Sequence, residues 1–293
     1  MSDPTPAARL DVTGLLVPER EAFADLLESL EGSAWELATE CPSWSVKGIA
    51  LHILGDDLSL LSRQRDQAAQ GLVLFAEGHP GLSFRQLLDG FNEQWVHAAM
   101  FLSESLVVEQ LRLTGEWTAR YYSGIDAEAL GEPVGFFGAR GPSPYWQIAA
   151  REYVERWVHH HQVRRAVGRP NLDGRFLVVA AAAVARSLAA NLGDVGAGPG
   201  TSMALTIPGV GAWTLTRGDE GWSLLDGTSG QAAVELTLDP ALATTVLSRG
   251  LTASEASAAF GVSGDGALAR RALAEIARMA GRPDTPDRGD ASS

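Results

Sequence analysis

The spacing of the apolar residues changes near Pro170, and this change constrains the fold more than any single motif. Before Pro170, apolar residues recur every three or four positions over long segments, which is the pattern of amphipathic helices. After it, short runs rich in β-branched and aromatic residues are separated by turn residues, which is the pattern of strands. The chain of 293 residues is also about twice the usual length of one domain, so we expect a two-domain α+β protein.

The first domain is expected over residues 1–170 as an antiparallel four-helix bundle, followed over 171–280 by a smaller α/β domain with a short, mainly antiparallel sheet. Residues 1–10 are expected to be a frayed lead-in, and residues 281–293 a disordered tail. The long helices of the bundle are predicted at 18–37, 45–70, 83–105 and 143–168, with a further helical stretch at 106–122. In the second domain, strands are predicted at 203–207, 212–217, 222–225 and 234–238, and helices at 175–192, 239–248 and 267–280.

Charge and composition narrow the range of partners. The formal net charge of -13 argues against nucleic acid or an anionic membrane surface as the main partner, although a small anion could still bind in a local basic pocket. No run approaches the roughly 20 apolar residues of a membrane span, and the N-terminus lacks a signal-peptide pattern, so a cytoplasmic protein is expected. Cys41 is the only cysteine, which excludes an internal disulfide and a cysteine-rich zinc cluster and favours a free structural thiol.

The helix predicted at 143–168 carries Glu155 and His159, which are spaced i,i+4 and therefore share one face. Apolar residues border this face, so the pair is a candidate half of a metal site. His159, His160 and His161 are adjacent, and side chains on neighbouring helical positions point about 100° apart, so the three cannot all serve one site. His159 is the preferred ligand, with His160 and His161 expected on the surface or behind the ligands. A solvent-exposed Glu–His pair is the alternative.

His52 falls in the second turn of the helix predicted at 45–70. Its face of that helix is unusually small and polar, and Gly48 and Gly55 indicate either a close helix approach or room for a bound group. Alone, His52 could equally be a hydrogen-bonded structural histidine. Together with Glu155 and His159 it gives two nitrogens and one carboxylate, a common ligand set for catalytic Zn²⁺ with one open position.

Two phrases resemble a known family. Residues 41–52, CPSWSVKGIALH, and residues 155–168, ERWVHHHQVRRAVG, are similar to the DinB-like metal-binding superfamily. Within it they resemble most the actinobacterial mycothiol-dependent maleylpyruvate isomerase family. The resemblance implies a four-helix metal-binding bundle, a divalent metal on His52, Glu155 and His159, and mycothiol as the thiol.

Some positions depart from the pattern of that family, and they bear on the substrate. Gln162 stands where the family commonly has Asp, and His160 and His161 replace smaller or amide residues. The Gly- and Pro-rich connection at 131–142 is also longer, and it is predicted as an ordinary loop or a lid over a site.

These observations lead to a functional hypothesis. We expect a metal-dependent thiol enzyme that uses mycothiol or a similar small thiol as cofactor or co-substrate. It would act as an S-transferase or a cis-trans isomerase on a small electrophile that carries a carboxylate, as a monomer or homodimer. Arg164 and Arg165 are candidate anchors for that carboxylate, with Arg164 as the candidate catalytic residue. The alternative for both is a charge at the helix C-terminus, and it is the preferred interpretation of Arg165. The alternatives are a metal-dependent hydrolase without a thiol and a non-catalytic DinB-like binding protein.

Overall fold

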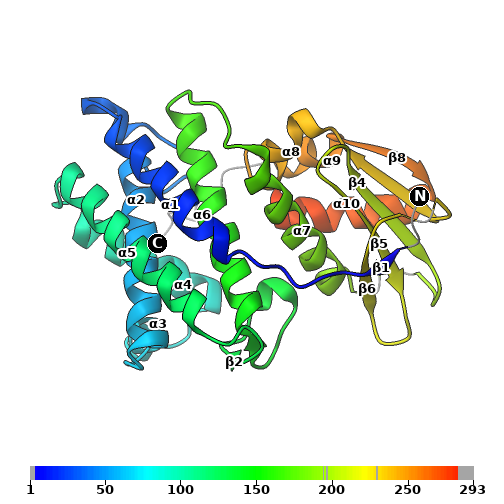
Figure 1. Ribbon diagram of the computed structural model, residues 1–293, viewed down its shortest axis with the longest axis horizontal. Helices are drawn as coiled ribbons and strands as arrows, with labels where there is room; N and C mark the ends of the chain where they lie inside the picture. The colour runs from blue at the N-terminus through cyan, green and yellow to red at the C-terminus, as the bar shows by residue number, and fades with distance from the viewer. Residues whose placement is uncertain (1–3, 194, 196, 229, 283–293) are drawn as a thin grey trace. The chain divides into compact units, whose positions relative to one another are not determined.

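The computed structural model describes residues 4–193, 195, 197–228 and 230–282 (Figure 1). These residues form helices and a six-stranded sheet, so the mixed helix-and-sheet fold that we expected is confirmed. The predicted tail lies, from residue 283 on, outside the described residues.

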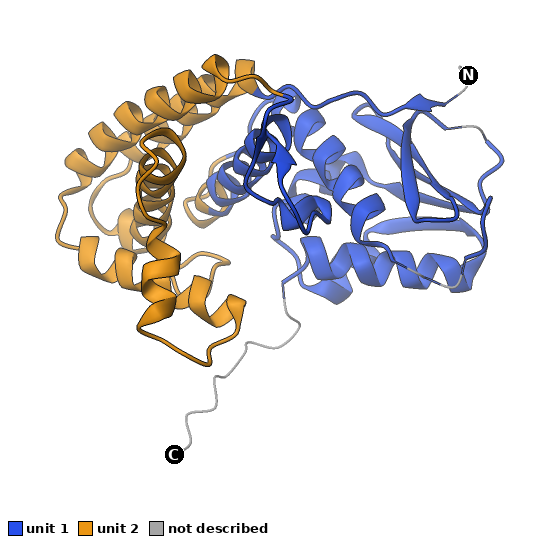
Figure 2. Ribbon diagram, turned by 90° about the horizontal axis from the view of Figure 1, so that it is seen from below, with its two compact units in different colours: residues 1–12, 128–162, 170–293 blue, residues 13–127, 163–169 orange. Residues whose placement is uncertain are grey.

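The chain divides into two compact units, which Figure 2 shows in two colours. Unit 1 contains residues 1–12, 128–162 and 170–293, and unit 2 contains residues 13–127 and 163–169. These units do not coincide with the two domains expected from the sequence, residues 1–170 and 171–280. The boundaries of those domains stay a prediction.

Unit 2 is helical. Its helix α5 packs against α1 and α2, and α4 packs against α2. Phe23, Leu27, Ile49 and Leu111 belong to the buried core that these helices share. The four-helix bundle that we expected includes the helix at 143–168, most of which belongs to unit 1. The bundle therefore stays a prediction. The helices of this unit are α1 (Thr13–Glu28), α2 (Val46–Leu60), α3 (Gly71–Glu77), α4 (Phe84–Ala99) and α5 (Glu104–Gly124).

Two predicted helices of this region were too long. The helix predicted at 18–37 ends at Glu28, and a short 3₁₀ helix, η1 (Gly32–Glu36), follows it. Gly32 has a φ of 49°, a left-handed conformation that interrupts an α-helix. The helix predicted at 45–70 ends as an α-helix at Leu60 and continues as one π-helical turn, η2 (Leu61–Arg65).

The sheet of unit 1 has the strand order β1-β6-β5-β4-β7-β8. Only the β4–β7 pair is parallel among its described neighbours, so the sheet is mainly antiparallel, as predicted. All four predicted strands are present, whereas β1 and β8 were missed. The lead-in at 1–10 is thus partly a strand, since Thr5 pairs with Asp226. The strands are β1 (Thr5–Pro6), β4 (Ser202–Ile207), β5 (Gly211–Arg217), β6 (Trp222–Asp226), β7 (Val234–Leu238) and β8 (Phe260–Gly264).

Helices pack against this sheet (Figure 1): α7 contacts β5 and β6, and α10 contacts β7 and β8. The side chains of β7 alternate between buried and exposed, which is the pattern of a strand with one face in the core. Among the described helices, α7 alone is long and apolar enough to cross a membrane, and 56% of that stretch is buried inside the fold. A buried core helix has the same composition. The helices are α7 (Gly174–Asn191), α8 (Pro240–Leu247), α9 (Ala253–Ala258) and α10 (Gly266–Ala280).

The helix that carries Glu155 and His159 is α6 (Tyr145–Ala166). A two-residue pairing of β2 (Leu130–Gly131) with β3 (Ser143–Pro144) precedes it. Gly168 ends it in a left-handed conformation with a φ of 66°, as predicted from its position before Pro170. In the 131–142 connection, the carbonyl of Phe136 accepts hydrogen bonds from Ser187 and Asn191 of α7. These bonds anchor the connection to the neighbouring helix.

The close packing of α2 and α4 can be tested at Gly55. A Cβ atom there would overlap the indole nitrogen of Trp95, which donates a hydrogen bond of 2.7 Å to the carbonyl of Leu51. We expect Gly55→Ala to lower the free energy of unfolding by about 1–3 kcal/mol because the indole must move. Gly14→Ala in α1 is the control, since nothing lies within 4 Å of its Cβ position. Urea unfolding measures both, and equal effects of the two substitutions would contradict the packing argument.

Candidate functional site

The middle of α6 holds a hydrogen-bonded row of polar side chains. The Nδ1 atom of His159 lies 2.8 Å from Oε1 of Gln162, and its Nε2 atom lies 3.3 Å from Oε1 of Glu155. His159 and Gln162 are buried, and Glu155 is half-buried. These residues are spaced i,i+3 and i,i+4, so the helix itself brings them together. The expectation that Glu155 and His159 meet on one face is confirmed.

Both ring nitrogens of His159 have a polar partner. Nδ1 lies beside the side-chain amide of Gln162, and Nε2 lies beside the carboxylate of Glu155. The tautomer of the ring sets which of the two nitrogens donates. An imidazole that is contacted on both sides in this way keeps one orientation.

Arginines hold the neighbouring carboxylates in place. Glu152 is buried and accepts a hydrogen bond of 2.9 Å from Arg151 and one of 2.8 Å from Arg156. Arg151 also lies 3.5 Å from the second carboxylate oxygen of Glu155. Because a buried carboxylate needs such partners, these arginines fix the rotamers on this face of α6.

His52 is held on α2 by a tryptophan. Ser45 begins this helix as its N-cap, and its hydroxyl accepts from the backbone NH of Gly48. The ring of His52 stacks on that of Trp44, with centroids 4.4 Å apart. A Cβ atom at Gly48 would lie 2.9 Å from Cβ of Trp44. Tryptophans thus occupy the space beside Gly48 and Gly55, and the close-approach interpretation of these glycines is the correct one.

His52, Glu155 and His159 form a group of potential metal ligands. Each offers one ligand atom, and these atoms all lie within 4.8 Å of one another. They are the three residues that the sequence suggested. Two imidazole nitrogens and one carboxylate suit zinc and related divalent metals. Their role as ligands stays a prediction.

The other two histidines of α6 are buried, which excludes the surface position that was one of the two expected for them. Both nitrogens of His161 contact the backbone: Nδ1 lies 2.8 Å from the carbonyl of Trp157, and Nε2 accepts from the NH of Leu172 at 3.3 Å. This ring therefore has a structural role. His160 is fully buried beside it, with ring centroids 6.0 Å apart. Sequence spacing alone did not decide between the two positions.

The two arginines near the end of α6 differ. Arg165 is paired with Glu40, with Nε 2.6 Å from Oε1, which is a more specific contact than the helix-end charge that we expected. Arg164 is half-buried, and burial lowers the pKa of its guanidinium, with a smaller contribution from the positive charge of Arg169. Its assignment as a catalytic residue stays a prediction. Cys41 is partly buried, and it forms no disulfide within the residues that the structure describes.

Sequence reasoning also missed residues that support the site. Gln162 orients His159, Arg151 lies beside Glu155, and Trp44 stacks on His52. The i+3 spacing of Gln162 from His159 was a signal for the first contact. No spacing rule indicates the stacking of Trp44, because that contact depends on the turn before α2.

The fold and this group of residues define a mixed helix-and-sheet protein with a partly buried histidine–carboxylate pair on one helix. The sequence profile described as "Mycothiol maleylpyruvate isomerase N-terminal domain" matches residues 16–164. The protein belongs to this family. His52, Glu155 and His159 all fall inside the matched region.

Two solved structures are also similar to the chain. One is a mycothiol-dependent maleylpyruvate isomerase, with 13% identity, a TM-score of 0.47, and coverage of 80% of this chain and 86% of that one. The other is a mutant of such an isomerase, with 13% identity, a TM-score of 0.48, and coverage of 86% and 91%. A comparison with curated proteins found no match.

The structural role of His161 can be tested. We expect His161→Ala to lower the free energy of unfolding by about 1–3 kcal/mol, because the partly buried NH of Leu172 loses its acceptor and the buried ring is removed. His79→Ala is a matched control. It also contacts a carbonyl four residues earlier, that of Phe75 at 2.8 Å, but it is exposed, so a change within about 0.5 kcal/mol is expected. Thermal unfolding compares them, and a neutral His161→Ala would refute the role.

Proposed function

We propose that this protein is a metal-dependent enzyme that uses mycothiol, and that His52, Glu155 and His159 bind the metal. The group formed by these three residues carries the proposal. The 3.3 Å contact between Glu155 and His159 supports it, since it places a carboxylate oxygen and an imidazole nitrogen side by side as two ligand atoms for one divalent cation. Zn²⁺ is the best candidate for this donor set. Family membership supports mycothiol as the thiol.

Metal and thiol together define the chemistry. A bound divalent metal would lower the pKa of a coordinated thiol, so that mycothiol supplies a thiolate nucleophile near neutral pH. The protein contributes orientation: Gln162 contacts Nδ1 of His159 and so leaves Nε2 toward Glu155, and Arg151 lies beside the carboxylate of Glu155. Such fixed partners preserve ligand geometry and the affinity for a metal.

The substrate is a small electrophile with a carboxylate, and Arg164 is the proposed anchor for that group. Arg165 is less suited because Glu40 already pairs with it. Partial burial of Arg164 strengthens a charge pair with a substrate anion. The isomerase named by the family is the first activity to assay. In an isomerase the thiolate would add to the double bond, the resulting single bond would rotate, and elimination of the thiolate would restore the double bond, whereas an S-transferase would leave the thiol on the product.

The metal assignment makes a direct prediction. The purified protein should contain about one zinc ion per chain, as expected for one three-ligand site. His52→Ala and His159→Ala should lose this ion, whereas His160→Ala and His161→Ala should keep it. Metal analysis of the folded variants measures the content. Equal zinc content in all four variants would show that the ligands are assigned wrongly.

The thiol assignment makes a second prediction. Mycothiol should raise the melting temperature of the zinc-loaded protein, because a ligand that binds only the folded state stabilises it. S-methyl mycothiol is the control, since it cannot form a thiolate and should stabilise less. Mycothiol together with maleylpyruvate should then yield the trans isomer or an S-adduct. No stabilisation by mycothiol would favour a metal-dependent hydrolase, or a non-catalytic binding protein if hydrolysis is also absent.

A further inference from the structure

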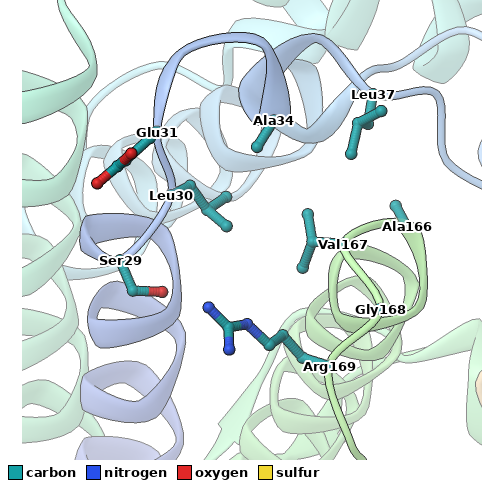
Figure 3. A pocket seen from close by; sticks show the side chains of 9 residues that line it. All are labelled: Ser29, Leu30, Glu31, Ala34, Leu37, Ala166, Val167, Gly168 and Arg169. Atoms are coloured by element: carbon teal, nitrogen blue, oxygen red, sulfur yellow. The ribbon is translucent and has the colours of Figure 1, made fainter.

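A second potential binding site lies in unit 2, where the end of α1 faces the end of α6 (Figure 3). The cavity has a volume of about 470 Å³, which is within the usual range for small-molecule sites. Its walls come from two segments, residues 29–37 and residues 166–169. Neither segment contains a proposed metal ligand. Ala166 follows His159 by seven residues, so the cavity begins roughly 10 Å farther along the axis of α6.

The floor of the cavity is apolar and fixed. Leu30, Ala166 and Val167 line it and also pack against the buried core of unit 2. Leu37 is another lining residue, and it remains 43% exposed although its side chain is large and apolar. A ligand with a short apolar chain would cover this surface, and the core beneath it would need no rearrangement.

A single cation extends into this apolar space. Figure 3 shows the guanidinium of Arg169 pointing into the cavity toward Ser29, whereas the carboxylate of Glu31 points away from its centre. The position of Arg169 is set by the turn that ends α6, since its NH donates a 2.7 Å hydrogen bond to the carbonyl of Arg164. Within the described parts of the chain, no hydrogen bond or ion pair of the Arg169 guanidinium is found.

The cavity is lined by one cation, Arg169, and one carboxylate, Glu31, and only the cation points into it (Figure 3). Arg169 lies close enough to Arg164 for its positive charge to lower the pKa of that guanidinium. A bound anion would therefore pair with a cation that also faces a second positive charge.

We propose that this cavity binds a small molecule with a carboxylate and a short apolar chain. The carboxylate pairs with the guanidinium of Arg169, whose fork of NH groups matches two carboxylate oxygens. The apolar chain lies against Leu30, Leu37 and Val167. This site is independent of the proposed metal and thiol chemistry, because its lining residues include none of the proposed ligands.

Hexanoate is a suitable probe, titrated into the full-length protein and followed by the backbone NMR signals of Leu30, Val167 and Arg169. We expect saturable shifts of these signals. Arg169→Gln should raise the Kd about tenfold or more, the effect of losing a charge-assisted pair. Leu37→Asp should weaken binding similarly, by removing apolar surface and adding a repelling charge. Arg270→Gln, at an exposed position of α10, is the control and should leave the Kd unchanged.

Hexanol separates the two parts of the proposal, since it keeps the apolar chain and lacks the charge. It should bind at least about tenfold more weakly than hexanoate. The site is refuted if hexanoate causes no shifts of these signals up to its solubility limit. It is also refuted if Arg169→Gln, or the change to hexanol, leaves the affinity unaltered. Because the assay needs neither metal nor thiol, its failure would leave the proposed enzymatic function untouched.

Discussion

The helices of unit 2 depend on a buried ion pair between Arg20 of α1 and Asp57 of α2. Both terminal nitrogens of Arg20 donate to this carboxylate, and one also donates to the carbonyl of Leu111 in α5 at 2.9 Å. Thr114 of α5 donates to the same carboxylate at 2.7 Å. Because leaving one buried charge alone costs about 3–5 kcal/mol, the three helices can pack in only one register. That register also sets His52, five residues before Asp57.

The fold was predictable where a pattern repeats within a short stretch. The four predicted strands are present because alternating residues and turn residues mark each of them locally, as in β7. Strand β1 was missed because Thr5 pairs with Asp226, more than two hundred residues away, and nothing local records that pairing. The early end of α1 was missed because the apolar spacing continues past Glu28. The left-handed backbone of Gly32 prevents an α-helix from continuing to residue 37.

The candidate site was predictable to the extent that one helix encodes it. The i,i+4 spacing of Glu155 and His159 is a property of the sequence, and the helix turns it into a contact of 3.3 Å. The burial of His160 and His161 was not predictable in the same way. Their adjacent positions show only that the rings point about 100° apart, not which of these directions lies inside the protein. Glu152 and Arg156 of the same helix are buried because they pair with each other. Periodicity detects polarity, whereas burial depends on which polar groups find partners.

The hydrogen bonds of α6 explain why its site is ready for a ligand. Buried polar side chains keep one conformation when their partners are satisfied, as those of Glu152 and His161 are. His159 is held in the same way on its Nδ1 side by Gln162. On the Nε2 side it contacts Glu155, whose other carboxylate oxygen lies 3.5 Å from Arg151. A framework that already holds an imidazole nitrogen and a carboxylate oxygen 3.3 Å apart needs little reorganisation to bind a cation, which is the physical basis for the proposed metal site.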